Sequence, residues 1–151
     1  MLSKRSIKLY PYIFILTILF MLSASIARAD RLSVKASIAN IRSGPGTKYE
    51  ILWKVEKYYP LKILKKSGKW YRFVDFEGDR GWIYRSLVGK TPTVIVKKEN
   101  CNVRSGPGKK FSVAFRAVKG VVFKVLKRKG NWIHVQHADG DKGWIAKSLV
   151  W

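Results

Sequence analysis

The sequence predicts an all-β protein built from two tandem small β-barrels, and three observations support this fold class. The first is an internal repeat, because Asn-Ile-Arg-Ser-Gly-Pro-Gly at 40–46 returns 62 positions later as Asn-Val-Arg-Ser-Gly-Pro-Gly at 102–108. The second is a period of two among the apolar residues of short segments, which is typical of strands with one buried face. The third is that turn residues separate these segments, while no window carries apolar residues at helical spacing.

The first 29 residues are expected to be a secretory signal peptide, which lies outside the fold. Three basic residues within the first eight positions precede an apolar run at 12–22, and Ala27-Arg28-Ala29 resembles a small-residue cleavage site. The alternative is a retained membrane anchor, because the uncharged span 9–27 approaches the ~20 residues that a transmembrane helix needs. We expect cleavage, and therefore an exported protein that is periplasmic or extracellular in a bacterium and keeps no membrane span.

The remaining chain divides into two repeat units. Unit one is predicted at 30–89, unit two at 94–151, and residues 90–93 form a short linker that Pro92 stiffens. The same offset relates the Gly-x-Trp, Gly-Trp-Ile and Ser-Leu-Val motifs of the two units. Each unit has ~60 residues, which is about the smallest size that folds without disulfides or metals. Two adjacent small domains with little freedom are therefore expected.

Within each unit, the first strands are expected where apolar residues recur at every second position. These segments are 51–55 and 61–64 in unit one and 113–117 and 123–126 in unit two. A further strand should follow Gly68 and Gly130, and another should contain the Gly-Trp-Ile motifs at 81–83 and 143–145. Each unit is therefore predicted to be a strongly bent barrel of about five strands.

Comparison of the two units sorts buried positions from exposed ones. Positions that stay apolar in both units are predicted to face the core, and these are Tyr71, Phe73 and Ile83 with their equivalents Ile133, Val135 and Ile145. Trp53 and Phe115 alternate with aliphatic residues and are also expected in the core. The intervening positions change between polar and apolar, so they belong to the wetter face of the same strands.

Several large aromatic residues fall on this wetter face and form a candidate binding surface, which we call the aromatic shelf. Its members are Trp70, Trp82 and Tyr84 in unit one and Trp132 and Trp144 in unit two. Aromatic rings combine a large apolar area with a polar edge, which suits ligand binding. The alternative is that these tryptophans pack the barrel, since large aromatics bury most of their area in either role.

These motifs together resemble the bacterial SH3 (SH3b) domain family. The resemblance covers residues 32–89 and 94–151, which is nearly all of the chain after the predicted signal. It implies two tandem SH3-like β-barrels of five to seven strands each. It also implies binding of the cell envelope, often of peptidoglycan, frequently as the targeting attachment of a hydrolase. Because unit two runs to Trp151, we expect binding to be the whole activity and expect no enzyme.

The repeated loop after Asn40 and Asn102 has two open interpretations. It is not a phosphate-binding P-loop, because the Gly-Lys-Ser/Thr ending is missing. In the structural interpretation, Gly44, Pro45 and Gly46 supply a bend and positive φ angles. Arg42 and Arg104 are candidates for contacts with an anionic ligand, but either guanidinium could equally hold the loop by bonding a carbonyl group.

Composition argues against metal, disulfide and catalytic chemistry. The chain has one cysteine and two histidines, which cannot supply a Cys-based metal cage or an internal disulfide, and no cofactor is expected. Cys101, His134 and His137 invite a thiol-hydrolase reading. The repeat argues against it, because they correspond to Ala39, Arg72 and Asp75 in unit one. The Gly-Asp turns at 77–79 and 139–141 are interpreted as hairpin chemistry.

The charge indicates the class of partner. Lys and Arg number 31 against 9 Asp and Glu, a formal net charge of +22, and basic clusters at 65–66 and 127–129 precede the Gly-x-Trp strands. The partner predicted is peptidoglycan or another anionic envelope polymer, although a solvated basic surface is the simpler interpretation. The alternatives are an envelope adaptor that binds an extended protein segment, and nucleic-acid binding, which the export signal disfavours. An envelope hydrolase is the last alternative.

Overall fold

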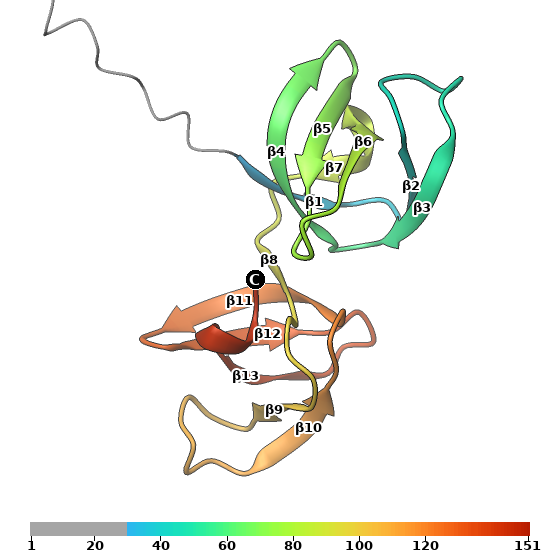
Figure 1. Cartoon of the computed structure of the whole chain (residues 1–151). Coiled ribbons are helices and arrows are strands. Elements are labelled where there is room, and N and C mark those ends of the chain that lie inside the picture. Colours follow the sequence, from blue (N-terminus) through green and yellow to red (C-terminus); the bar gives the residue numbers. More distant parts are fainter. Residues whose placement is uncertain (1–29) are drawn as a thin grey trace, which may run out of the picture.

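The computed structural model describes residues 30–151, so the predicted signal peptide lies outside the described residues. The first sheet belongs to unit one (Figure 1), and its strands are β1 (Arg31–Val34), β2 (Ile38–Arg42), β3 (Ile51–Glu56), β4 (Pro60–Ser67), β5 (Trp70–Val74), β6 (Arg80–Tyr84) and β7 (Val88–Gly89). The second sheet has β8 (Thr93–Ile95), β9 (Cys101–Arg104), β10 (Val113–Ala117), β11 (Val122–Lys129), β12 (Trp132–Gln136) and β13 (Lys142–Ala146). Two short 3-10 turns, η1 (Arg85–Leu87) and η2 (Lys147–Leu149), are the helical segments of this described part. The all-β prediction is confirmed.

The two sheets share one topology. Their strand orders are β3-β2-β6-β5-β4-β1-β7 and β10-β9-β13-β12-β11-β8, and each strand of the second sheet has its equivalent in the first. All pairings are antiparallel, and an isolated bridge between Val96 and Val150 takes the place of β7 in unit two. The longest strand carries a register shift at equivalent places, after Ile63 in β4 and after Val125 in β11. Such bulges bend a strand, which lets each small sheet curl around its own core.

The predicted inward face is confirmed almost completely. Phe73 and Ile83 in unit one are fully buried, as are Val135 and Ile145 in unit two. Ile133 is also buried, whereas Tyr71 is only half-buried at the rim of its core. Trp53 and Phe115 are half-buried and pack against the two separate core clusters. The period of two between the repeats was therefore a reliable guide to the core.

A glycine in each unit permits the close approach of two strands. Gly143 in β13 lies so near β9 that an added Cβ would be 2.6 Å from Val103 Cγ1 and 3.0 Å from the Arg104 carbonyl oxygen. Gly81 is the equivalent in β6, where a Cβ would meet Ile41. The glycine of the Gly-Trp-Ile motif therefore serves the close packing of two strands.

Replacing Gly143 by alanine is expected to lower the free energy of unfolding of unit two by about 1–3 kcal/mol, because the backbone at Arg104 cannot yield as a flexible side chain would. Denaturant unfolding of the variant measures this. Gly89→Ala is the matched control, because its Cβ would meet only Lys35 Cδ, at 3.7 Å. Equal stability of the two variants would contradict the packing role.

Both units donate hydrogen bonds to the linker. Ser33 Oγ in β1 donates to the Thr91 carbonyl oxygen at 2.8 Å, and the Val125 amide in β11 donates to the Pro92 carbonyl oxygen at 2.9 Å. The last residue, Trp151, pairs with Ile95 of β8 through two backbone hydrogen bonds, at 2.9 and 3.1 Å. These bonds anchor residues on both sides of the junction. Within residues 30–151, no helix has the length and apolar character needed to span a membrane.

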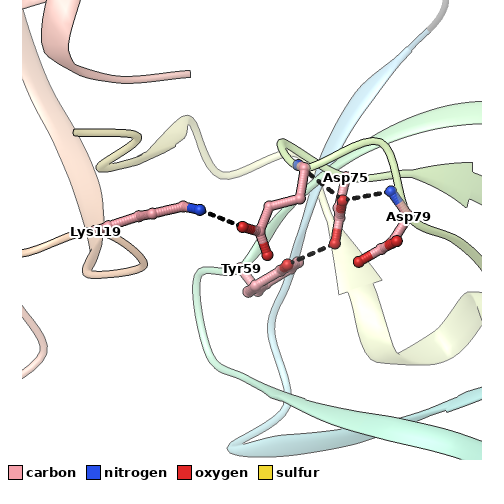
Figure 2. A network of polar contacts seen from close by, with 5 residues as sticks. Tyr59, Asp75, Asp79 and Lys119 are labelled. Carbon is pink, nitrogen blue, oxygen red and sulfur yellow. Dashed lines mark hydrogen bonds and ion pairs between the residues drawn. The ribbon is translucent and has the colours of Figure 1, made fainter. Parts of the chain in front are cut away.

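A buried carboxylate organises the turn between β5 and β6 (Figure 2). Asp75 accepts hydrogen bonds from the amides of Glu77 and Asp79, at 3.0 and 2.9 Å, and from the Tyr59 hydroxyl at 2.8 Å. Glu77 extends from this turn to an ion pair with Lys119 of unit two. In unit two the equivalents of Asp75 and Tyr59 are His137 and Val121, so this network belongs to unit one alone.

Replacing Tyr59 by phenylalanine is expected to destabilise unit one by about 1–3 kcal/mol at pH 7, because the buried Asp75 loses a donor. Burial, with the hydrogen bond and charge of Asp75, raises the pKa of Tyr59 above its ordinary value. The stabilisation from a raised pKa is complete below the unfolded tyrosine's pKa of about 10 and is lost at higher pH. Denaturant unfolding should therefore show a constant advantage of the natural chain over Tyr59→Phe up to about pH 10, and a steady decrease of that advantage at higher pH. A pH-independent difference would contradict this.

Candidate ligand-binding grooves

Unit one carries an open groove of about 680 Å³, which we call groove one. Its lining residues are Ile38, Ala39, Asn40, Arg42, Gly46, Thr47, Trp70, Tyr84 and Leu87. Trp70 in β5 and Tyr84 in β6 are directly opposite each other in the sheet, and their ring centroids lie 5.4 Å apart with the ring planes at 64°. Both side chains are half-buried, so they keep exposed ring area for a ligand while their orientation is fixed by the neighbouring ring.

The opposite wall of groove one is the repeated loop, which an arginine holds in place. Arg42 Nη1 donates to the carbonyl oxygens of Thr47 and Tyr49, at 3.0 and 2.8 Å. Arg104 Nη1 makes the equivalent bond in unit two, to the Phe111 carbonyl oxygen at 2.9 Å. Of the two interpretations open from sequence, the structure contains the loop-holding bond in both units. Arg42 also lines groove one, so an anion contact by its other nitrogen atoms stays a prediction.

The glycines of this loop act differently from the sequence expectation. Neither Gly44 nor Gly46 has a positive φ, so the predicted left-handed backbone is wrong at both positions. An added Cβ on Gly44 would collide with the Tyr49 ring, and one on Gly106 would collide with the Phe111 ring. Glycine is needed because an aromatic ring folds directly over the loop backbone. Tyr49 and Phe111 therefore pack on the loop backbone at Gly44 and Gly106, a role that sequence reasoning missed.

The predicted aromatic shelf is divided in the structure. Trp82 lies on the same face as Trp70, but it does not line groove one; its cross-strand neighbours are Arg42 in β2 and Arg72 in β5. Its partner in unit two, Trp144, stacks on the His134 ring with centroids 4.8 Å apart and planes at 14°. In the structure, Trp70 therefore contacts Tyr84 within groove one, whereas Trp82 and Trp144 lie outside the grooves.

Unit two has a corresponding opening with different chemistry, which we call groove two. It measures about 750 Å³ and is lined by Lys109, Asn131, Trp132, Ala146, Lys147 and Ser148. Trp132 is the equivalent of Trp70, but its cross-strand neighbour is Ala146 in place of Tyr84. Lys109 replaces Thr47 at the loop. Groove one is thus a two-ring, largely apolar opening, and groove two is a single ring beside two lysines.

Groove one also has apolar members that the sequence analysis did not select. Ile38 keeps 62% of its surface exposed at the rim, and Leu87 lies at the end of η1. The signal was present for Ile38, because its equivalent is Asn100 and a position that alternates between isoleucine and asparagine is not a core position. No comparable signal marked Leu87, whose equivalent is also leucine.

The residues considered for catalysis are dispersed. Cys101 is buried at the start of β9, where burial raises the pKa of its thiol and Sγ donates to the Lys98 carbonyl oxygen at 3.3 Å. His134 is stacked on Trp144, and His137 Nδ1 lies 2.8 Å from a carboxylate oxygen of Asp139. Backbone and side-chain hydrogen bonds hold the pKa of Asp139 below its ordinary value. Among residues 30–151, no three Cys, His, Asp or Glu side chains gather in a way that could hold a metal ion.

Comparison with known proteins shows that this chain is similar in sequence to several proteins named as amidases. A Bacillus subtilis protein named as an N-acetylmuramoyl-L-alanine amidase, YrvJ, is 28% identical over 160 residues, covering 98% of this chain and 31% of that protein. A Staphylococcus epidermidis protein named as a cell wall amidase, LytH, is 47% identical over 53 residues, covering 34% of this chain and 18% of that protein. The chain therefore spans less than a third of the length of these relatives.

A solved structure of an NlpC/P60 family protein from Bacillus cereus aligns with a TM-score of 0.39 and 13% identity, over 81% of this chain and 56% of that chain. The model of the family described as bacterial SH3 domain matches two segments, 35–90 and 97–151. Each segment contains all strands of one sheet except its first, β1 or β8, and the resemblance stated from the repeated motifs is confirmed. The chain belongs to the bacterial SH3 domain family and carries two such domains in tandem.

Proposed function

We propose that this chain is an exported, non-catalytic protein that binds the bacterial cell wall, and that groove one is its principal contact with peptidoglycan. The observation that carries the proposal is the pairing of Trp70 with Tyr84 in an open groove whose walls are largely apolar. The relatives named as amidases of the cell wall support the choice of ligand. The predicted signal peptide supports the location.

The mechanism follows from the chemistry of the two grooves. In groove one, the Trp70 and Tyr84 rings lie against the C–H faces of sugars or the methyl groups of stem peptides. In groove two, Trp132 makes a similar contact, and Lys109 and Lys147 meet stem-peptide carboxylates. Each groove binds weakly by itself. Two linked grooves on a repeating polymer gain avidity, because the second contact forms at a high effective concentration.

The absence of catalysis is tested separately from binding. Purified residues 30–151 incubated with sacculi are expected to sediment with them and to release no soluble muropeptides, because both domains are proposed to act only as binding modules. Reversed-phase chromatography of the supernatant measures release, with a known amidase as the positive control. Release above the level of a heat-denatured sample would contradict the non-catalytic part of the proposal and leave the binding part standing.

A second candidate is an adaptor that binds an extended protein segment, and the composition of groove one favours it. Ile38 and Leu87 flank the aromatic pair, so the groove could accept apolar side chains of a peptide. Photocrosslinking from position 38 in cells would discriminate between the two functions. Adducts with one envelope protein that survive lysozyme digestion would favour the adaptor, and adducts that lysozyme removes would favour the wall.

A further inference from the structure

A second kind of opening lies between the two domains, and it shares Lys147 with groove two but no lining residue with groove one. This interdomain cleft of about 540 Å³ is bounded by β1 of unit one, by the linker, and by the last residues of unit two. Four basic residues line it, and they are Arg31, Lys97, Arg128 and Lys147. No aspartate or glutamate is among its lining residues in the described part of the chain. The rest of its wall is mostly apolar, with side chains such as Leu32 and Val150, and includes the polar Thr91 and Thr93.

Arg31 is held in this cleft by an aromatic ring. Its guanidinium carbon lies 3.9 Å from the centroid of the Trp151 ring, so an arginine from unit one stacks on the last residue of unit two. Stacking orients the planar guanidinium while leaving its in-plane N–H donors available. Partial burial and the neighbouring charge of Arg128 lower the pKa of Arg31. Two like charges therefore face the same opening, and a shared counter-charge would relieve their repulsion.

The contacts between the domains make the cleft a built feature. Ser33 bonds the linker at Thr91, and the Lys119–Glu77 ion pair joins the two units directly (Figure 2). Arg128 belongs to a basic cluster that the sequence analysis placed beside Trp132, yet it lines the cleft and is absent from the lining of groove two. Arg31 and Arg128 converge only because the two domains are docked.

We propose that the interdomain cleft is an oxyanion-binding site, in which Arg31 and Arg128 together hold a phosphate or carboxylate group of an envelope polymer. The guanidinium forks match both groups, because each presents paired oxygen atoms in a plane or on a tetrahedral face. The apolar wall at Leu32 and Val150 accommodates the carbon chain next to the anion. Arg31 and Arg128 line neither groove one nor groove two, so they add a third contact to the protein.

Isothermal titration of residues 30–151 at moderate salt tests the site with two anionic probes and a neutral one. The probes are a glycerol-phosphate oligomer, an oligogalacturonate of similar length, and chitotetraose as the neutral comparison. Arg31→Gln combined with Arg128→Gln is expected to weaken anion binding by about tenfold or more, since each charge-assisted bond contributes strongly. The matched control is Arg80→Gln with Lys142→Gln, which removes two exposed charges at the starts of β6 and β13 and so keeps the net charge equal.

The possible outcomes distinguish a specific anion site in the cleft from diffuse charge attraction. A loss confined to the cleft variant, with the Trp151 indole NMR signal moved by the probe, supports the site, and the tighter probe identifies phosphate or carboxylate. Equal losses in the two variants would overturn it in favour of diffuse charge attraction, and so would a failure of both anions to bind. Trp70→Ala should leave the affinity for the glycerol-phosphate oligomer unchanged, because Trp70 does not line the cleft and this probe has no sugar ring, which separates this test from that of the proposed function.

Discussion

Trp70→Ala is expected to weaken binding of residues 30–151 to purified sacculi by about tenfold to a hundredfold, which corresponds to a hot-spot residue at the centre of a binding surface. The variant removes the larger of the two rings that form groove one and leaves Tyr84 without the neighbour that orients it. Trp132→Ala should have a smaller effect, because groove two has alanine where groove one has Tyr84. Sedimentation isotherms at fixed salt measure both.

The matched control is Trp82→Ala, which removes an equally large ring from the same face but from outside groove one. Its binding should change by less than about threefold, since residues outside a hot spot contribute little. If Trp70→Ala and Trp82→Ala lowered the affinity for sacculi equally, the ligand would cover the whole face, as an undivided aromatic shelf predicts. Unchanged binding by Trp70→Ala would remove groove one from the account.

Phe73→Ala is expected to unfold unit one while unit two stays folded. Phe73 is fully buried and packs edge-on against Trp53, with ring centroids 6.3 Å apart, so its loss should cost about 3–5 kcal/mol. A domain of ~60 residues is only marginally stable, and that cost removes most of its free energy of unfolding. Two-dimensional amide NMR spectra should show dispersed signals from 94–151 beside collapsed signals from 30–89.

The reciprocal variant, Phe123→Ala, should unfold unit two alone, because Phe123 is the large buried side chain of the second core cluster. Loss of both sets of dispersed signals in either variant would show that the contacts between the units, including the Arg31–Trp151 stacking and the Lys119–Glu77 ion pair, make them one cooperative structure. Residues 90–93 would then connect two parts of one cooperative folding unit, and they would not separate two domains that unfold independently.

The fold was predictable from this sequence because the chain contains the same unit twice. Positions such as Phe73 and Val135 differ in size but stay apolar, and that shared property marks a buried face more reliably than either residue alone. The motif glycines were also recognisable in the sequence, but their structural role could not be predicted from it. Gly44 lacks a positive φ and is needed because the Tyr49 ring covers it, and a contact between residues five positions apart leaves no periodic signal.

The candidate site was predictable only in part, for a related reason. Alternation along β5 and β6 places Trp70, Trp82 and Tyr84 on one face, but it does not say which of them the loop at 43–50 will enclose. That depends on the Arg42 bonds to Thr47 and Tyr49, which fix the loop from a neighbouring strand. The interdomain cleft could not be predicted from the sequence, because Arg31 and Trp151 meet only through the docking of two domains.

Co-sedimentation of residues 30–151 with purified sacculi across a salt series tests whether aromatic contacts in the grooves hold the protein on the cell wall. Contacts made by aromatic rings in a groove are little affected by salt, whereas attraction between exposed charges is largely screened once the Debye length falls well below about 10 Å. The account predicts that a substantial bound fraction persists at moderate salt and is lost when Trp70 and Trp132 are both replaced by alanine. Binding that disappears with modest salt and ignores both tryptophans would contradict it, and would leave charge alone as the basis of association.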